Sequence, residues 1–127
     1  MASGHEAETL DRARALDPDN LLRGFLLLPP DREPGTVFAY NQPATYALAA
    51  ILQRVTGQSL TDYLRPRLLD PLGIGEVAWL ADSSGRELGF SGLHGTTDVL
   101  ARLGQLYLGE GVWEGERHEP VAQHMYD

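Results

Sequence analysis

The 127 residues suit a single domain over residues 1–127, and a hydrophobic fraction of 43% is close to the globular average. The net charge of −8 disfavours nucleic acid and anionic membranes as partners, because both are bound by clustered cationic side chains. Cysteine is absent, which excludes disulfides, thiol chemistry and cysteine-ligated zinc. All ten cationic side chains are arginine, so the sequence contains no lysine.

The first nine residues have neither the cationic start nor the apolar stretch of a signal peptide, so we expect a cytoplasmic protein. The longest apolar run, residues 25–30, is far too short to cross a bilayer. No membrane partner is therefore expected.

Two short helices are predicted before the first pair of prolines. Ser3 and Glu6 have the spacing of a capping box, which predicts a polar helix from Glu6 to Leu16. Asp17 followed by Pro18 fits the N-cap and first position of a second helix, where the missing N–H of proline costs nothing. Pro29 and Pro30 end that helix. Its apolar residues are Leu21, Leu22, Phe25 and Leu26.

The third helix follows a turn at Asp31–Gly35 and an extended piece at Thr36–Tyr40. Apolar residues at i, i+3, i+4 and i+7 predict a helix over Pro43–Thr56 with one buried stripe. Gly57 suits the left-handed conformation after the last turn. The residues of the stripe are Leu48, Ile51, Leu52 and Val55.

A fourth helix is predicted to begin at Ser59, because Ser59 to Asp62 has the spacing of another capping box. Pro66 lies inside the pattern and should kink or limit the helix, which ends at Pro71 and Gly73. The expected buried face consists of Leu60, Tyr63, Leu64, Leu68 and Leu69.

Gly75–Phe90 is expected to be irregular, with a short strand at Val77–Trp79. The last helix begins after Thr96 or Thr97 as N-cap and ends at Gly109. The tail beyond it has no clear period. The apolar stripe of this helix consists of Val99, Leu100, Leu103, Leu106 and Tyr107.

Four segments occur in an order that is similar to that of a known enzyme family. They are Pro34–Gln42 ahead of the third helix, Val55–Ser59 at its end, Asp70–Ile74, and Gly92–Leu103. The ordered set resembles the β-lactamase-related serine hydrolases, which include class C β-lactamases, D-Ala-D-Ala peptidases and related esterases. The resemblance is strongest over residues 35–108.

This resemblance implies a mainly α fold: the helical lobe of the α/β fold of serine β-lactamases and penicillin-binding proteins, with most of the β-sheet missing. The family uses a Ser-x-x-Lys nucleophile helix and usually a Lys-Thr-Gly strand, and neither can occur in a chain without lysine. Residues 1–4 resemble the stretch that follows the nucleophile helix. We therefore expect a fragment of such a hydrolase that is inactive alone.

The resemblance also implies the site residues. Tyr40 falls on the catalytic tyrosine of the Tyr-x-Asn motif, where a phenolate accepts the proton of the serine. Gln42 takes the place of the asparagine that binds substrate or the catalytic lysine, with a side chain one methylene longer. Asn41 is a second candidate for that amide if the loop register differs.

No metal or cofactor is expected. No two of the histidines are spaced i, i+4, so solvated surface histidines are the simpler interpretation. Ser91 lies close to His94 in sequence, but no Gly-x-Ser-x-Gly pattern surrounds it. The four histidines are His5, His94, His118 and His124.

The intact family takes a small ester, lactam or peptide as substrate. A helical lobe without its sheet should leave an apolar face open, so a homodimer or a complementary fragment is the expected partner. The alternative function is a non-catalytic helical binding or interaction module derived from the same family.

Overall fold

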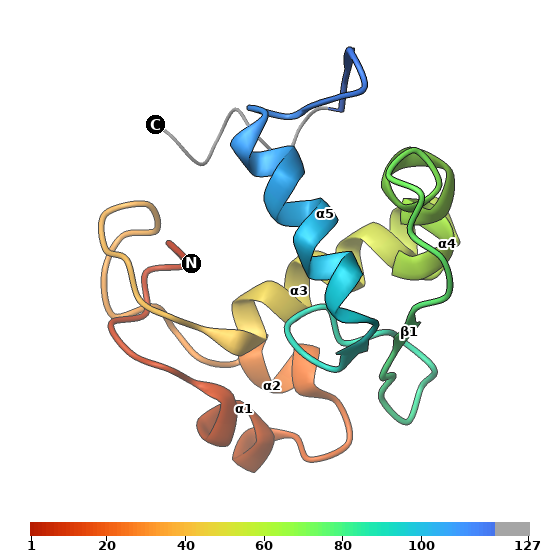
Figure 1. Cartoon of the computed structure of the whole chain (residues 1–127). Coiled ribbons are helices and arrows are strands. Elements are labelled where there is room, and N and C mark those ends of the chain that lie inside the picture. The colour runs from red at the N-terminus through yellow and green to blue at the C-terminus, as the bar shows by residue number, and fades with distance from the viewer. Residues whose placement is uncertain (119–127) are drawn as a thin grey trace.

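The computed structural model describes residues 1–118, which are mostly helical with two short β-ribbons (Figure 1). The predicted mainly α fold is confirmed. The helices are α1 Leu10–Leu16, α2 Leu21–Leu26, α3 Gln42–Thr56, α4 Leu60–Leu64, the π-helical turn η1 Arg65–Leu69, and α5 Thr97–Leu108. The ribbons pair β1 Ala78–Trp79 with β2 Leu93–His94, and β3 Val112–Trp113 with β4 Glu116–Arg117, both antiparallel. No helix within this range is long and apolar enough to span a membrane.

The first three helices form one packing unit, with α1 and α2 side by side (Figure 1). Ala13, Phe25 and Leu28 are its buried core. Gly24 lets the two helices approach closely, because a Cβ atom built there would lie 2.0 Å from the carbonyl oxygen of Ala13. The absence of a side chain at Gly24 therefore sets the distance between α1 and α2.

The predicted start of the first helix at Ser3 and Glu6 is wrong. The helix begins after Thr9, and the Ser3 hydroxyl shares a 3.0 Å hydrogen bond with Nδ1 of His5. Glu6 instead pairs with Arg32, whose Nε lies 2.6 Å from Oε1 of Glu6. Both side chains of the expected capping box thus bind other partners, Ser3 a near neighbour in sequence and Glu6 a distant residue.

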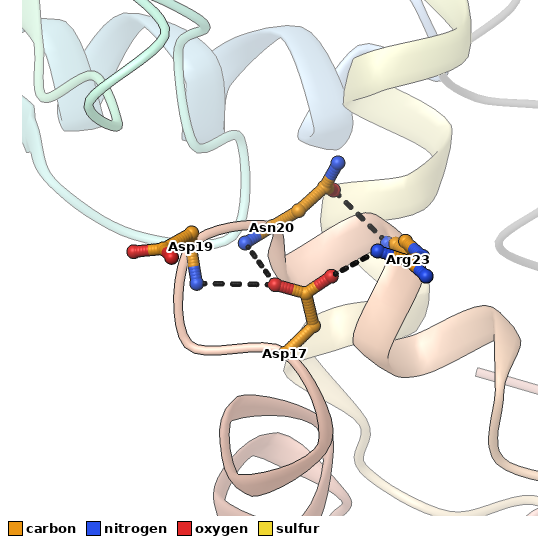
Figure 2. A network of polar contacts seen from close by, with 4 residues as sticks. All are labelled: Asp17, Asp19, Asn20 and Arg23. Carbon is orange, nitrogen blue, oxygen red and sulfur yellow. Dashed lines mark hydrogen bonds and ion pairs between the residues drawn. The ribbon is translucent and has the colours of Figure 1, made fainter.

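The second helix also begins later than predicted. Asn20 is its N-cap, and its Oδ1 accepts a 3.0 Å hydrogen bond from the backbone N–H of Arg23 (Figure 2). Asp17 shapes the turn before the helix, since its Oδ1 accepts from the backbone N–H groups of Asp19 and Asn20. Its Oδ2 also lies 3.3 Å from Nη1 of Arg23. The sequence offers both Asp17 and Asn20 as N-cap residues, and Asn20 is the one that caps α2.

The third helix has the predicted extent, and Gly57 ends it in the left-handed conformation with φ of 68°. Its predicted buried face is wrong, because Leu48, Ile51 and Val55 are 66%, 55% and 79% exposed. The buried residues are instead the smaller or polar-tipped Pro43, Tyr46, Ala49 and Ala50.

Small residues on that face allow the loop before β2 to pack directly against α3. A Cβ atom built on Gly89 would lie 2.5 Å from the Cβ of Ala49. Gln53 holds the same loop, since it donates to the backbone carbonyl of Glu87 at 2.9 Å and accepts from its N–H at 2.9 Å. Contact between backbone and small side chains decides which face of α3 is inside.

The predicted cap of the fourth helix is confirmed, since the Ser59 hydroxyl accepts a 3.0 Å hydrogen bond from the N–H of Asp62. Pro66 changes the helix as expected, because the chain passes there into the π-helical turn η1. Leu69 joins a second core between η1 and α5. The buried members of this core are Leu69, Leu72, Ile74, Val99 and Leu106.

The fifth helix follows Thr96 as predicted, although the Thr96 side chain makes no capping hydrogen bond. Of its predicted stripe, Val99 and Leu106 are buried, whereas Leu100 is exposed. The ribbon after α5 was not expected from the sequence. Its turn has positive φ angles at Glu114 and Gly115, as two-residue hairpins require.

Candidate active site

Tyr40 lies at the end of the extended piece that leads into α3, and its side chain is 56% exposed. Backbone hydrogen bonds tie this piece to the first residues of the chain, from Gly35 N–H to the Ala2 carbonyl at 2.8 Å and from Ala39 N–H to the Met1 carbonyl at 3.2 Å. The Tyr40 phenol is therefore exposed to solvent, and these hydrogen bonds hold the backbone segment that carries it.

Asn41, the next residue, is fully buried, and its amide is committed within the chain. Its Oδ1 caps α3 by accepting from the Ala44 N–H at 3.0 Å and also accepts from the Thr9 hydroxyl at 3.2 Å. Its Nδ2 donates to Oγ1 of Thr9 at 2.9 Å and to the Ala7 carbonyl at 3.2 Å. This amide anchors the start of α3 against the start of α1 rather than facing solvent.

Glu8 joins the same two helix starts, and the sequence analysis did not identify it. Its carboxylate accepts hydrogen bonds from the N–H groups of Thr9 at 2.8 Å, Leu10 at 3.0 Å and Gln42 at 3.1 Å. Backbone N–H groups in the first turn of a helix lack intrahelical partners, so one carboxylate satisfies donors of both helices. Glu8 and Gln42 are 34 residues apart in sequence, so no local pattern could predict the contact.

Gln42 is the other predicted amide, and its side chain is half-buried. Within residues 1–118 its side-chain amide has no hydrogen-bond partner, in contrast to that of Asn41. Tyr40 and Gln42 therefore lie on either side of buried Asn41, and no other residue within 1–118 binds the polar atoms of their side chains.

A second polar cluster lies behind α3, centred on buried Tyr46. Its hydroxyl donates a hydrogen bond to Oδ2 of Asp82 and accepts one from Nη1 of Arg86 at 3.3 Å. Burial, and then the bond to Asp82, raise the pKa of Tyr46. Burial alone would raise the pKa of Asp82, but hydrogen bonds from Ser84, Tyr46 and the Arg86 N–H together lower it. This cluster holds the loop that contains Asp82 and Arg86 against α3.

The other residues considered from the sequence do not form a second site. Ser91 and His94 share no hydrogen bond in residues 1–118, and the Ser91 carbonyl accepts from Nε1 of Trp79 at 2.9 Å. His5 is buried, so its interpretation as a surface histidine is wrong. His124 lies outside the described residues. Within them, no three His, Asp or Glu side chains gather closely enough to hold a metal.

Comparisons with known proteins agree with the geometry. The model of the Beta-lactamase family matches residues 1–123. A solved structure with the name "Putative 6-aminohexanoate-dimer hydrolase from Bacillus anthracis" is 33% identical in sequence, with a TM-score of 0.64. The match covers 73% of this chain and 24% of that one, so this chain spans about a quarter of that protein's length. No curated protein matches.

The family match covers nearly all of the chain, including the segment that holds Tyr40 and the whole of α3. The structural match finds the same helical arrangement within the solved structure that carries the hydrolase name. The chain belongs to the Beta-lactamase family.

Proposed function

We propose that this chain contributes Tyr40 as the proton acceptor of an acyl-transfer site that hydrolyses an amide, lactam or ester. The serine that attacks the carbonyl and its lysine come from another polypeptide segment, because the 127 residues include no lysine. Gln42 contacts the substrate beside Tyr40. One observation carries the proposal: an exposed phenol stands at the start of α3 on a backbone anchored by buried Asn41.

The chemistry requires such a phenol to be available and positioned. A general base acts only on a proton within hydrogen-bond reach, so it needs a fixed backbone and a free hydroxyl. In residues 1–118 the Tyr40 hydroxyl has no hydrogen-bond partner, whereas that of Tyr46 is bound to Asp82 and Arg86. As a phenolate, Tyr40 can therefore accept a proton from a group brought beside it, whereas the hydroxyl of Tyr46 is already bound by two partners.

The proposal predicts where an acylating reagent reacts. The isolated chain should remain unmodified by a fluorescent penicillin or a fluorophosphonate, because a base without a nucleophile forms no adduct. When the chain is mixed with a second polypeptide that carries the family's Ser-x-x-Lys helix and closing strands, the reagent should label that second polypeptide. Intact mass spectrometry of both chains locates the adduct, and a stoichiometric adduct on the isolated chain would overturn the proposal.

An interaction module without catalysis is the second candidate, and the open face of α3 favours it. Leu48, Ile51 and Val55 lie at i, i+3 and i+7 on one exposed side of α3. Contiguous apolar surface of this kind marks a protein contact. Under the catalytic proposal that contact is the complementary polypeptide or a second copy of this chain.

The two candidates differ in what the assembled complex does. If the complementary polypeptide binds tightly but the complex forms no acyl adduct and hydrolyses no ester, the interaction module is the correct function. If binding brings ester hydrolysis, the contact serves catalysis.

A further inference from the structure

An apolar cavity lies away from the Tyr40 site, between α4, η1, α5 and the β1–β2 ribbon. Its volume is about 120 Å³ and it is partly enclosed. Figure 1 shows α4, β1 and the first turns of α5 on the same side of the molecule. The residues around it are Thr61, Leu64, Leu68, Leu69, Val77, Trp79, Leu93, Val99 and Leu103.

The wall of this cavity presents no polar atom. Its two polar-tipped side chains have their hydrogen bonds elsewhere: the Thr61 hydroxyl donates to Oε1 of Glu87 at 2.9 Å, and Nε1 of Trp79 donates to the Ser91 carbonyl at 2.9 Å. An ordered water needs two to four polar partners, so the cavity offers water nothing to bind.

Hydrogen bonds outside the cavity also hold its walls in place. Glu87 fixes the start of α4 by accepting from the Thr61 N–H at 2.8 Å, and Arg102 of α5 donates to the Leu72 carbonyl at 2.8 Å. The buried core residues Leu69 and Val99 form part of the wall. These contacts oppose collapse of the cavity.

We propose that this cavity is a binding site for a small uncharged apolar molecule or apolar chemical group, up to about the size of benzene. An engineered apolar cavity of about 150 Å³ in a protein interior stays dry and binds benzene or xenon, and this partly enclosed cavity is close to that size. A ligand gains dispersion contacts with the apolar side chains of the wall. Charged ligands should bind much more weakly, because the wall has no group that can pair with a charge.

Benzene is the test ligand, and benzoate is its charged counterpart of the same ring size. We expect benzene to shift the amide and indole resonances of the wall saturably in a ¹H–¹⁵N spectrum of the full chain, with the largest shift at the Trp79 indole. Benzoate should bind at least tenfold more weakly. The melting temperature should rise with benzene concentration, as it does for any ligand that binds only the folded state.

Filling the cavity should remove this binding. Leu103→Phe places a ring in the cavity and should weaken benzene binding at least tenfold. Leu100→Phe, on the exposed side of the same helix, is the matched control and should leave binding unchanged. Val77→Leu takes the place of the first variant if circular dichroism shows that Leu103→Phe is unfolded.

Three results would overturn the proposal: no saturable shift with benzene, equal affinity for benzoate, or unchanged benzene binding in the filled variant. None of these measurements uses Tyr40, so the proposal stands or falls separately from the proposed function.

Discussion

At the scale of single residues, the buried Asn41 amide holds the exposed phenol beside it in place. It caps α3 and bonds to Thr9 through both the oxygen and the nitrogen of its amide. It also donates to the carbonyl of Ala7, in the segment before α1. Its removal would leave the buried Thr9 hydroxyl without these bonds and would free the more exposed Ala7 carbonyl. The position beside the catalytic candidate is thus a structural one.

Asn41→Ala should lower the free energy of unfolding by about 2–4 kcal/mol, because a cap and several buried hydrogen bonds are lost together. Ser59→Ala, which removes only the cap of α4, should cost about 1 kcal/mol. Urea unfolding followed by circular dichroism measures both. Equal losses in the two variants would show that the buried amide contributes no more than an ordinary cap.

Asp82 should make stability depend on acidity. The folded state lowers its pKa below the ordinary 3.8, so its contribution is present above pH 3.8 and is lost as pH falls through the lowered value. Asp82→Asn should therefore destabilise the protein at neutral pH by about 1–2 kcal/mol, and the difference should shrink at pH 2–3. Urea midpoints across this range measure it.

Asp19→Asn is the control for the Asp82 variant, since the Asp19 carboxylate has no hydrogen-bond partner among residues 1–118 (Figure 2). Its stability should follow that of the unaltered protein at every pH. If the loss of stability caused by Asp82→Asn stays constant from pH 7 to pH 2, the assignment is contradicted.

At the scale of elements, features set by neighbours in sequence could be predicted and those set across the fold could not. The Ser59 cap, the Gly57 stop and the change at Pro66 depend on local chemistry, and each is found. The start of α1 could not be predicted because Glu6 pairs with Arg32, 26 residues away, while Ser3 bonds to His5 instead of a helix N–H.

The buried face of α3 shows the same limit. Helical periodicity located the helix but assigned its inside to the large apolar residues. The structure buries Ala49 and Tyr46 instead, because a backbone segment packs on the alanine and Asp82 binds the phenol. In the candidate site, Tyr40 and Gln42 came from a motif, whereas Glu8 acts through a contact that no motif contains.

Two helical glycines test how closely these elements pack. Gly24→Ala should destabilise the protein by about 1–3 kcal/mol or more, because the new methyl group would overlap the Ala13 carbonyl and push α1 from α2. Gly104→Ala meets no atom within 4 Å and should stabilise α5 by about 0.5–1 kcal/mol. Thermal unfolding compares them, and equal effects of the same sign would contradict the close approach.

At the scale of the whole molecule, the open side of α3 should govern association. Because Leu48, Ile51 and Val55 are exposed together, we expect the purified chain to self-associate with rising concentration. Replacing Leu48 and Val55 with glutamine should give a monomer of unchanged helical content. Light scattering decides, and a monodisperse monomer of the unaltered chain would remove the idea of a missing partner on this face.

The central claim is that Tyr40 serves as the proton acceptor of a shared active site. Its most direct test is ester hydrolysis by this chain combined with a polypeptide that carries the Ser-x-x-Lys helix. Tyr40→Phe should lower kcat by about 10²–10⁴-fold, the usual contribution of a general base. Tyr63→Phe, which keeps the ring that lies 4.1 Å from the Arg67 guanidinium, should leave the rate unchanged. Equal rates for Tyr40→Phe and the unaltered chain would contradict the claim.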